Sequence, residues 1–518
     1  MKKIWYILGC FFLLAGCFED ESNYDYQEVE QIKVSGMLSS YRLVAGVDTL
    51  KIDLEVKDYR EDMNLAYIWK IYNSELSAVK PDTLDWHTPN VRELLHYPTG
   101  KYTLLLEVKD LKTDLSVLQT TEVVLTTTYS DGWYLLKETT DGNTDLDFHF
   151  EIAIDDTTKV WHAIPDVLKE NNKTGLSGKP VSIFYNPLSN WIDTSNTRRK
   201  EQAFFIQSEE QMKVYQIAEM VQTRNYLDCF YKGQPEQSEQ INMFFTYYNM
   251  CLIDGGGLYT LENGNSVGKF GMARPSNKPY RISGRGVSKC MMEFMVYDDL
   301  NGRYLHGHYK DNQLEEYTSK DELGNETAVP PYDLGMKLVF LGFEHNITMS
   351  GDTYAVLESL GQPHRRVVHV LDISKIAFKN LKGLLNPIKR VFDVKESSAL
   401  AKANLICNNR DVEILYCAVG DKIYFCPVTG GGMGEEKMMK DFEGEEITYI
   451  NHFKTTKGTK WGGLEIATYQ NGRYKLYLYE LVGQMLKDIP TQVFEGNGRI
   501  QEAVYVCRDA NIGSAPYK

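Results

Sequence analysis

The chain has 518 residues and a net charge of −15 at pH 7, because 71 acidic residues outnumber 56 basic ones. Nucleic acids and anionic lipid surfaces attract basic patches, so this balance argues against both as partners. A hydrophobic content of 43% is enough for globular cores, and the length predicts two or more domains or one large repeat architecture.

Residues 1–16 have the pattern of a secretory signal peptide. Lys2 and Lys3 give the positive start, and an apolar run follows over residues 4–14. That run is shorter than the ~20 residues needed to cross a bilayer, but it fits the core of a signal peptide. Leu14-Ala15-Gly16-Cys17 resembles the bacterial lipobox, in which the cysteine takes a lipid before cleavage. We therefore expect cleavage before Cys17 and lipidation of this residue; the alternatives are an ordinary signal peptide with a chance cysteine and a short membrane anchor.

An acidic segment follows the cysteine. Phe18-Glu19-Asp20-Glu21-Ser22 places three carboxylates within four positions of Cys17. Removal of residues 1–16 takes away two positive charges and leaves a net charge of −17. In the Bacteroidetes, such a cluster resembles the signal that sends lipoproteins to the outer face of the outer membrane. We interpret residues 17–28 as the lipidated cysteine and an acidic tether facing the cell exterior; a plain solvated tether is the alternative.

Residues 29–127 show the alternation of apolar and polar side chains that is typical of half-buried strands. The predicted strands cover residues 32–34, 49–56, 66–72, 100–110 and 121–125. A domain of about 100 residues with this pattern is a β-sandwich candidate. Trp69 lies where the core tryptophan of an immunoglobulin-like sandwich belongs, and Tyr102 lies where its tyrosine corner belongs.

This aromatic pattern resembles PKD-like domains, in which a strand ends near a tryptophan and a Gly-x-Tyr strand follows later. The run Asn23-Tyr24-Asp25-Tyr26 is similar to the start of the PKD-like lipoproteins of Bacteroidetes. The resemblance covers roughly residues 17–130. It implies an outer-membrane setting and a SusC/SusD-like importer as partner, in which a TonB-dependent barrel works with a ligand-capturing lid.

Residues 128–518 contain recurring strands that follow tight turns and carry an aromatic residue. Tyrosines at such turns are Tyr259, Tyr304, Tyr354, Tyr424 and Tyr474, spaced by 45, 50, 70 and 50 residues. This period is close to the ~40–50 residues of a four-stranded propeller blade. The sequence therefore predicts an all-β protein, with a PKD-like β-sandwich followed by a β-propeller of about seven blades. Two further sandwich domains are the alternative, and residues 208–221 and 373–385 are interpreted as helical insertions.

Three short segments have some features of ligand sites. Gly430-Gly431-Gly432-Met433-Gly434 lacks the Lys-Ser/Thr that follows a phosphate loop, so we expect a plain loop. Residues 141–147 offer oxygen ligands at alternate positions, but Leu146 and Ile152 depart from the EF-hand pattern and favour a polar hairpin turn. His306 and His308 would share one face of a strand, yet no third metal ligand is identifiable nearby.

Seven cysteines remain after Cys10 and Cys17. They are Cys229, Cys251, Cys290, Cys407, Cys417, Cys426 and Cys507, and they form no CxxC pair. An odd number leaves at least one free thiol. We expect most of them to be small buried hydrophobic residues, while a Cys417–Cys426 disulfide across adjacent strands stays open.

The sequence favours a binding protein over an enzyme, because it contains no Gly-x-Ser-x-Gly elbow or other catalytic constellation. We assign no catalytic residue, metal or cofactor. The favoured function is a surface-exposed outer-membrane lipoprotein, accessory to a SusC/SusD-like nutrient importer, that binds glycan or peptide. A structural component of the importer complex and a surface hydrolase are the alternatives. The ligand class and the ligand-binding residues stay open, and the aromatics considered first are Trp133, Trp161, Trp191 and Trp461.

Overall fold

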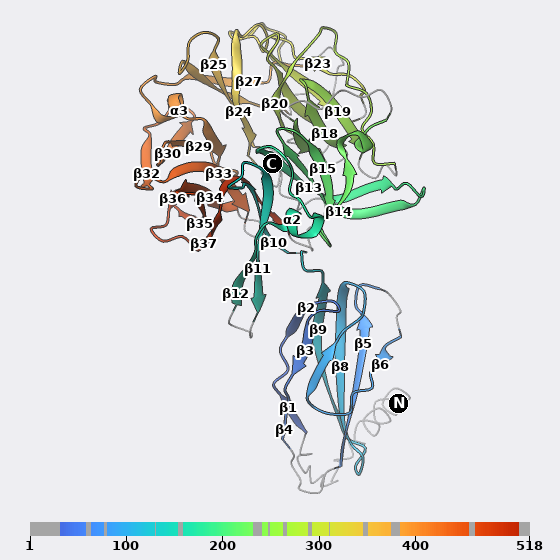
Figure 1. The fold of residues 1–518 in the computed structure, drawn as a ribbon. Coiled ribbons are helices and arrows are strands. Elements are labelled where there is room, and N and C mark those ends of the chain that lie inside the picture. The colour runs from blue at the N-terminus through green and yellow to red at the C-terminus, as the bar shows by residue number, and fades with distance from the viewer. Residues whose placement is uncertain are drawn as a thin grey trace, which may run out of the picture. The chain divides into compact units, whose positions relative to one another are not determined.

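A computed structural model shows two compact units, Met1–Thr126 and Thr127–Lys518, whose elements are labelled in Figure 1. The described residues are 32–57, 64–76, 80–129, 131–153, 159–231, 241–246, 249–262, 267–287, 293–309, 311–344, 351–373, 384–454 and 461–506. The predicted signal peptide 1–16, Cys17 and the predicted tether 17–28 lie outside them. Within these ranges, no helix has the length and apolar character needed to cross a membrane.

The first unit is a β-sandwich. Its strands are β1 (Lys33–Ser35), β2 (Ser40–Val44), β3 (Thr49–Ile52), β4 (Glu55–Lys57), β5 (Leu65–Asn73), β6 (Asp82–Thr83), β7 (Val91–Leu94), β8 (Gly100–Asp110) and β9 (Ser116–Thr126). A five-stranded sheet has the order β2-β9-β8-β5-β6, and β3-β7 and β1-β4 form two small sheets. The three sheets share one apolar core. The predicted strand 49–56 is wrong as a single strand: the backbone N–H of Leu54 donates to the Asn90 side chain (3.2 Å), and β3 and β4 take different partners.

Two aromatic residues organise the core of this sandwich as predicted. Trp69 is fully buried on β5, and its indole N–H donates to the carbonyl of Thr88 (3.0 Å). The Tyr102 hydroxyl on β8 donates to the carbonyl of Pro98 (2.8 Å), four residues upstream. This bond from a buried tyrosine to preceding backbone is the tyrosine corner of immunoglobulin-like sandwiches.

The second unit contains seven sheets within the described residues, which we number as blades in chain order. Blade 1 has β10 (Gly132–Glu138), β11 (Thr144–Ala153), β12 (Lys159–Ile164) and the last strand, β38 (Arg499–Val506); blade 2 has β13 (Pro180–Ile192), β14 (Arg198–Ser208), β15 (Met212–Gln216) and β16 (Val221–Asn225); blade 3 has β17 (Ile241–Phe245), β18 (Asn249–Asp254) and β19 (Gly257–Glu262). Blade 4 has β20 (Ile282–Val287), β21 (Glu293–Asp298), β22 (Arg303–His308) and β23 (Glu315–Glu316); blade 5 has β24 (Met336–Phe343), β25 (Thr353–Ser359), β26 (Arg366–Leu371) and β27 (Ile388–Asp393). Blade 6 has β28 (Leu405–Asn408), β29 (Ile414–Val419), β30 (Lys422–Thr429), β31 (Gly432–Met433) and β32 (Lys437–Asp441); blade 7 has β33 (Glu446–Lys454), β34 (Trp461–Gln470), β35 (Arg473–Val482), β36 (Met485–Leu486) and β37 (Gln492–Asn497). Short helices α2 (Val167–Asn172), η1 (Tyr226–Cys229) and α3 (Ala399–Lys402) lie between strands.

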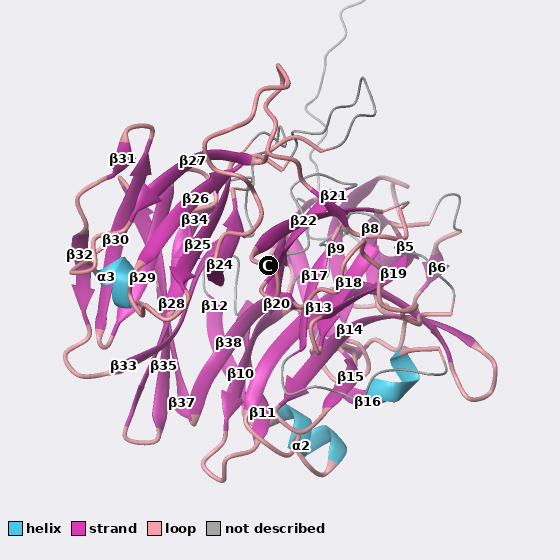
Figure 2. Cartoon of the chain, turned by 90° about the horizontal axis from the view of Figure 1, so that it is seen from above, coloured by secondary structure: helices cyan, strands magenta, loops and turns pink. Residues whose placement is uncertain are grey.

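These sheets form a closed ring, which confirms the predicted propeller of about seven blades. The innermost strands β38, β13, β17, β20, β24, β28 and β33 each contact the next, and β33 contacts β38 again. Figure 2 shows the blades arranged around a common centre. An apolar cluster fills each seam, with Phe148 and Phe204 between blades 1 and 2, Phe205 and Leu252 between 2 and 3, Phe244 and Phe294 between 3 and 4, Tyr304 and Leu357 between 4 and 5, Val368 and Leu415 between 5 and 6, Tyr416 and Leu464 between 6 and 7, and Leu476 and Leu135 between 7 and 1.

Two sequence predictions about this unit need correction. Residues 208–221 are not helical: they run from the last residue of β14 through β15 and the turns on either side of it to the first residue of β16. Met212 and Val214 pack toward blade 3 while Tyr215 packs toward blade 1, so burial on both faces of the blade obscures the strand periodicity. Of the second predicted helix, 373–385, residues 374–383 lie outside the described residues.

The tyrosine repeat is also only partly a blade repeat. Tyr259, Tyr304, Tyr424 and Tyr474 lie on the third strands of blades 3, 4, 6 and 7. Tyr354 lies on β25, the second strand of blade 5. The spacing of 50 residues before it therefore does not measure a blade, although the average period still indicated the right number of blades.

Among the described residues of the propeller, four histidines are buried, on β11, β22, β26 and β33. Burial lowers the pKa of His149, His306 and His369 to about 4 and that of His452 to about 3. Each folded-state pKa lies below the ordinary value of ~6.5, so these rings are neutral when the chain is folded at neutral pH. Unfolding in acid therefore adds protons to them.

We expect the free energy of unfolding to fall as the pH drops from about 6.5 to 4. In that window the unfolded state binds the protons and the folded state does not, which costs about 1.4 kcal/mol per pH unit for each histidine. Burial raises the pKa of Asp145 to about 6, which has the opposite effect, so a variant must isolate the histidine contribution. Urea titrations at several pH values give the free energy of unfolding as a function of pH. This pH dependence should be shallower for His369→Gln than for the wild-type protein. The exposed His87→Gln should keep the wild-type slope, and equal slopes for all three proteins would contradict the assignment.

Candidate functional site

An open cleft lies where blades 7 and 1 meet, at the start of β38. Its volume is about 330 Å³, within the range of small-molecule sites. It is lined by Glu138, Thr139, Thr140, Gly142, Tyr469, Gly472, Gly498 and Arg499. These residues belong to the β10–β11 turn, the β34–β35 turn and the link from β37 to β38, so blades 1 and 7 both contribute. We call it the seam cleft.

Local sequence explains the two hairpin turns. In the β10–β11 turn, the Thr139 side chain and the Asn143 amide both hydrogen-bond to Asp141, and the backbone N–H of Thr139 donates to the carbonyl of Asn143 (2.8 Å). In the β34–β35 turn, Asn471 and Gly472 have φ values of 52° and 81°. Asn-Gly with two positive φ angles is the favoured two-residue turn for a hairpin.

Gly498 holds the three turns together. Its φ is 102°, and a Cβ atom there would lie 2.4 Å from the carbonyl oxygen of Glu138. Its backbone N–H donates to the carbonyl of Gly472 (2.9 Å). Only glycine fits this approach, so the floor of the seam cleft depends on it.

The charged groups of the seam cleft face each other and are paired at its rim. Glu138 and Arg499 are opposite each other in the β10–β38 ladder. A Glu138 carboxylate oxygen lies 3.3 Å from the Lys179 amine, and Arg499 donates to Glu446 (2.6 Å). Charges balanced in this way favour a neutral, polar ligand over an ion.

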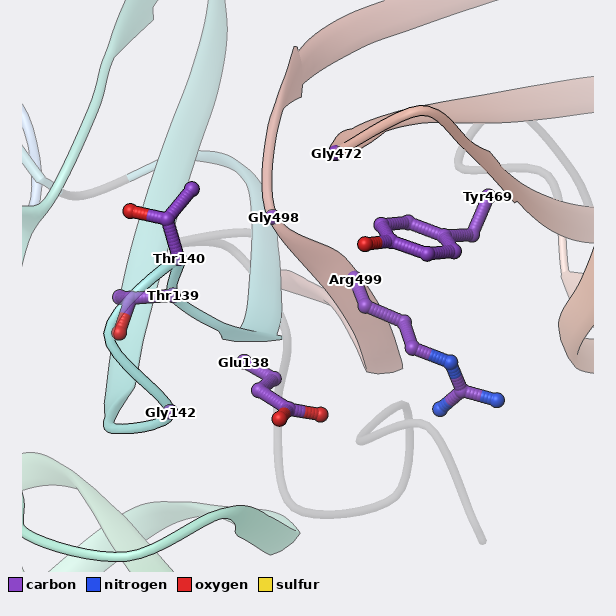
Figure 3. A pocket seen from close by; sticks show the side chains of 8 residues that line it. All are labelled: Glu138, Thr139, Thr140, Gly142, Tyr469, Gly472, Gly498 and Arg499. Atoms are coloured by element: carbon purple, nitrogen blue, oxygen red, sulfur yellow. The ribbon is translucent and has the colours of Figure 1, made fainter.

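One aromatic ring and two hydroxyl side chains complete the seam cleft. Tyr469 is half-buried, and in Figure 3 its ring and the Arg499 side chain lie on one side, with Glu138, Thr139 and Thr140 on the other. Hydroxyl, carboxylate and guanidinium groups around an aromatic ring can hydrogen-bond a hydroxylated ligand while the ring contacts its apolar face.

A buried polar network adjoins the seam cleft. The Lys137 amine, next to Glu138, lies 2.6 Å from Asp147 and 2.9 Å from Asp166. The Tyr474 hydroxyl donates to Asp147 (2.6 Å) and lies 3.2 Å from the Nε2 atom of His149. Burial alone would lower the pKa of Lys137, but the two carboxylates outweigh it and raise this pKa. Burial and Asp147 together raise the pKa of Tyr474, so the network links blades 1 and 7 through charged lysine and neutral tyrosine.

The segments singled out in the sequence do not converge on the seam cleft, except for the hairpin at 141–147. Asp145 and Asp147 of that hairpin are buried on β11, where Asp145 accepts from the backbone N–H of Leu168 (2.8 Å) at the start of α2 and Asp147 pairs with Lys137. Both carboxylates are therefore engaged with groups of the protein. Among the residues that the structure describes, no group of three or more His, Cys, Asp or Glu side chains is arranged to hold a metal.

The other candidates are dispersed through the ring. His306 is buried against Tyr317, and His308 lies 3.6 Å from Asp311. Of the predicted loop 430–434, residues 430–431 form the turn between β30 and β31, whereas Gly432–Met433 are the short strand β31. The Sγ atoms of Cys417 and Cys426 are 3.6 Å apart as buried thiols.

The tryptophans are mainly packing residues. Trp133 is buried against Phe453 and Tyr505, half-buried Trp161 contacts Phe494, and half-buried Trp191 lies 5.4 Å from the Arg224 guanidinium. The Trp461 side chain lies outside the described part of the chain.

Residues 17–180 match the PKD-like family. The matched segment begins at Cys17, spans the sandwich and continues through β10, β11, β12 and α2 to the start of β13. The PKD-like resemblance is thus confirmed for this part of the chain. A search of curated proteins finds no match.

Several solved structures are similar to the chain at low identity. A quinoprotein alcohol dehydrogenase-like protein of Bacteroides thetaiotaomicron is 11% identical, with coverage of 90% of this chain and 96% of the other and a TM-score of 0.35. The β-propeller domain of Cps50 (Swd1) from Myceliophteria thermophila is 9% identical, with coverage of 68% and 98% and a TM-score of 0.39. PorZ, a bacterial surface component of the type-IX secretion system of Porphyromonas gingivalis, is 11% identical, with coverage of 78% and 53% and a TM-score of 0.31. These similarities concern the fold alone.

The close approach of Gly498 to the Glu138 carbonyl predicts that a single added methyl group strongly lowers the stability of the propeller. Gly498→Ala should destabilise the propeller by about 3 kcal/mol or more, because the methyl group collides with the Glu138 carbonyl and the positive φ adds strain. Gly472→Ala is the matched control: its φ is also positive, but a Cβ there meets no atom within 4 Å, so we expect a loss of about 1 kcal/mol. Thermal and urea unfolding measure both. Equal losses would contradict the close approach.

Proposed function

We propose that this protein is a lipid-anchored, surface-exposed protein of the outer membrane that binds glycan in the seam cleft and serves a SusC/SusD-like importer. The seam cleft is the observation that carries the binding part of this proposal. It combines a half-buried tyrosine ring with hydroxyl, carboxylate and guanidinium groups in one open hollow. Sugars present both an apolar ring face and many hydroxyl groups, and such a lining suits both.

Binding is favoured over hydrolysis by the lining of the cleft. A glycosidase uses two carboxyl groups that flank the scissile bond. Among the lining residues, Glu138 contributes the carboxylate, and the neighbouring Glu446 is engaged with Arg499. A peptide remains the second ligand class to test, because tyrosine and polar groups also recognise peptides.

The anchoring part of the proposal rests on the N-terminal sequence. The lipobox-like run ends at Cys17, and the PKD-like match begins at the same residue. Agreement between a cleavage signal and the start of a domain family supports Cys17 as the first residue of the mature chain. The acidic residues after Cys17 support localisation on the outer face of the outer membrane.

Replacement of Tyr469 should weaken glycan binding. We expect Tyr469→Ala to raise the Kd for a bound oligosaccharide about two- to tenfold, since an aromatic contact contributes ~0.5–1.5 kcal/mol. Tyr469→Phe should retain most of the affinity. Tyr332→Ala removes an exposed tyrosine away from the cleft and serves as the control. A glycan array followed by calorimetry measures this, with a peptide library as the second arm; unchanged binding by Tyr469→Ala would exclude the cleft.

Replacement of Cys17 should release the protein from the membrane. We expect Cys17→Ser to move the chain from the membrane fraction to the soluble fraction, because the lipid supplies the anchor. In wild-type cells, protease added outside should degrade the protein, and affinity purification from solubilised membranes should recover a TonB-dependent barrel with its lid. Membrane retention of Cys17→Ser would contradict lipidation. Protection from external protease would contradict surface exposure, and failure to recover a barrel would contradict the importer partner.

A further inference from the structure

The innermost strand of blade 4 contains a bulge. Ile282 pairs with Asp298 and Gly286 pairs with Val296, so four steps along β20 face only two along β21. The additional residues lie in the segment Ser283-Gly284-Arg285. Bulges take residues out of the ladder and redirect their side chains, and they are frequent next to functional sites.

This bulge exposes Arg285 inside the ring. Gly284 and Arg285 are both exposed, although β20 lies between the innermost strands β17 and β24. Inner strands of a propeller border its central channel, so the exposed residues of the bulge face that channel. A Cβ atom at Gly284 would meet no atom within 4 Å, which indicates open space beside the bulge.

The surroundings of Arg285 leave its hydrogen-bond donors available. Its guanidinium lies 5.6 Å from the centre of the Phe340 ring on β24. Within the described part of the chain, Arg285 makes no hydrogen bond or ion pair. Arg285 is accessible to solvent, but the protein atoms around its guanidinium partly desolvate it and lower its pKa; the charge of Glu502 on β38 opposes this shift without an ion pair to Arg285. One oxygen of Glu502 instead accepts from the backbone N–H of Ile183 (2.9 Å).

We propose that the segment Ser283-Gly284-Arg285-Gly286 forms a site for a small monocarboxylate in the central channel, with the Arg285 guanidinium as its anchor. The planar guanidinium matches a carboxylate through two parallel hydrogen bonds. Glu502 places a negative charge nearby, which disfavours a doubly charged phosphate. The open space at Gly284 gives the ligand room to reach the arginine. This site is separate from the seam cleft and does not depend on the function proposed for it.

Calorimetry and thermal unfolding on the purified full-length protein test this site. The probes are glucuronate, glucose and inorganic phosphate at equal ionic strength. We expect glucuronate to bind and raise the Tm, glucose to have no effect, and phosphate to bind more weakly. Arg285→Gln should weaken glucuronate binding at least about tenfold, because the charge-assisted bonds are lost. The affinity of Arg285→Lys for glucuronate should lie between those of the wild type and Arg285→Gln. The exposed Arg365→Gln is the control.

A second variant keeps the test decisive if Arg285→Gln does not fold. Gly284→Leu retains the charge but fills the open space beside it, so it should also abolish glucuronate binding. Gly431→Leu, in the β30–β31 turn with equally open surroundings, should leave binding unchanged. Glucuronate binding that survives both Arg285→Gln and Gly284→Leu would overturn the proposal, as would phosphate binding as tight as glucuronate. Tyr469→Ala should bind glucuronate normally, which separates this site from the seam cleft.

Discussion

The propeller depends on the burial of both faces of every blade. Each sheet is apolar on two sides, and each seam between sheets is filled by side chains from both neighbours. Such sheets are stable only when the ring is closed, because an open ring would expose the faces of its two end blades. Closure is achieved by β38, which pairs with β10 and completes blade 1 with the last described strand of the chain. The folding of this unit is therefore non-local.

The same closure creates the seam cleft. Glu138 and Arg499 are far apart in sequence and become neighbours only because β10 and β38 pair. Gly498 allows the close backbone approach, and the Lys137 network fixes the adjoining strands through buried charge. A buried lysine requires paired carboxylates, so this network has little freedom to rearrange. The cleft is consequently a feature of the joint between the ends of the propeller.

Hydrogen bonds between blades line the inner edge of the ring, and Arg285 differs from the residues that make them. Asn408 donates to the carbonyl of Phe343 (2.8 Å), Tyr449 to that of Ala503 (3.3 Å), and Asn242 to that of Gly284. These bonds join neighbouring innermost strands, which compensates for the lack of a strand partner on that side. Arg285 instead extends from a bulge beside them, and among the described residues its guanidinium lies over the Phe340 ring without a hydrogen bond or ion pair. A charged group left out of an otherwise bonded edge is better explained by a ligand than by stability.

The sequence by itself determined the class and order of the domains. Alternating strands, Trp69 and Tyr102 indicated the sandwich, and recurring turn residues indicated a propeller of about seven blades, because these patterns arise from local strand geometry and burial. The prediction of a helix at residues 208–221 and the use of Tyr354 to measure the blade period were wrong, since burial on both faces of a blade removes the simple alternation of apolar and polar residues. Only the tertiary structure decided the seam cleft and the exposure of Arg285. Both depend on ring closure and strand register, which join residues hundreds of positions apart and leave no periodic signal in the chain.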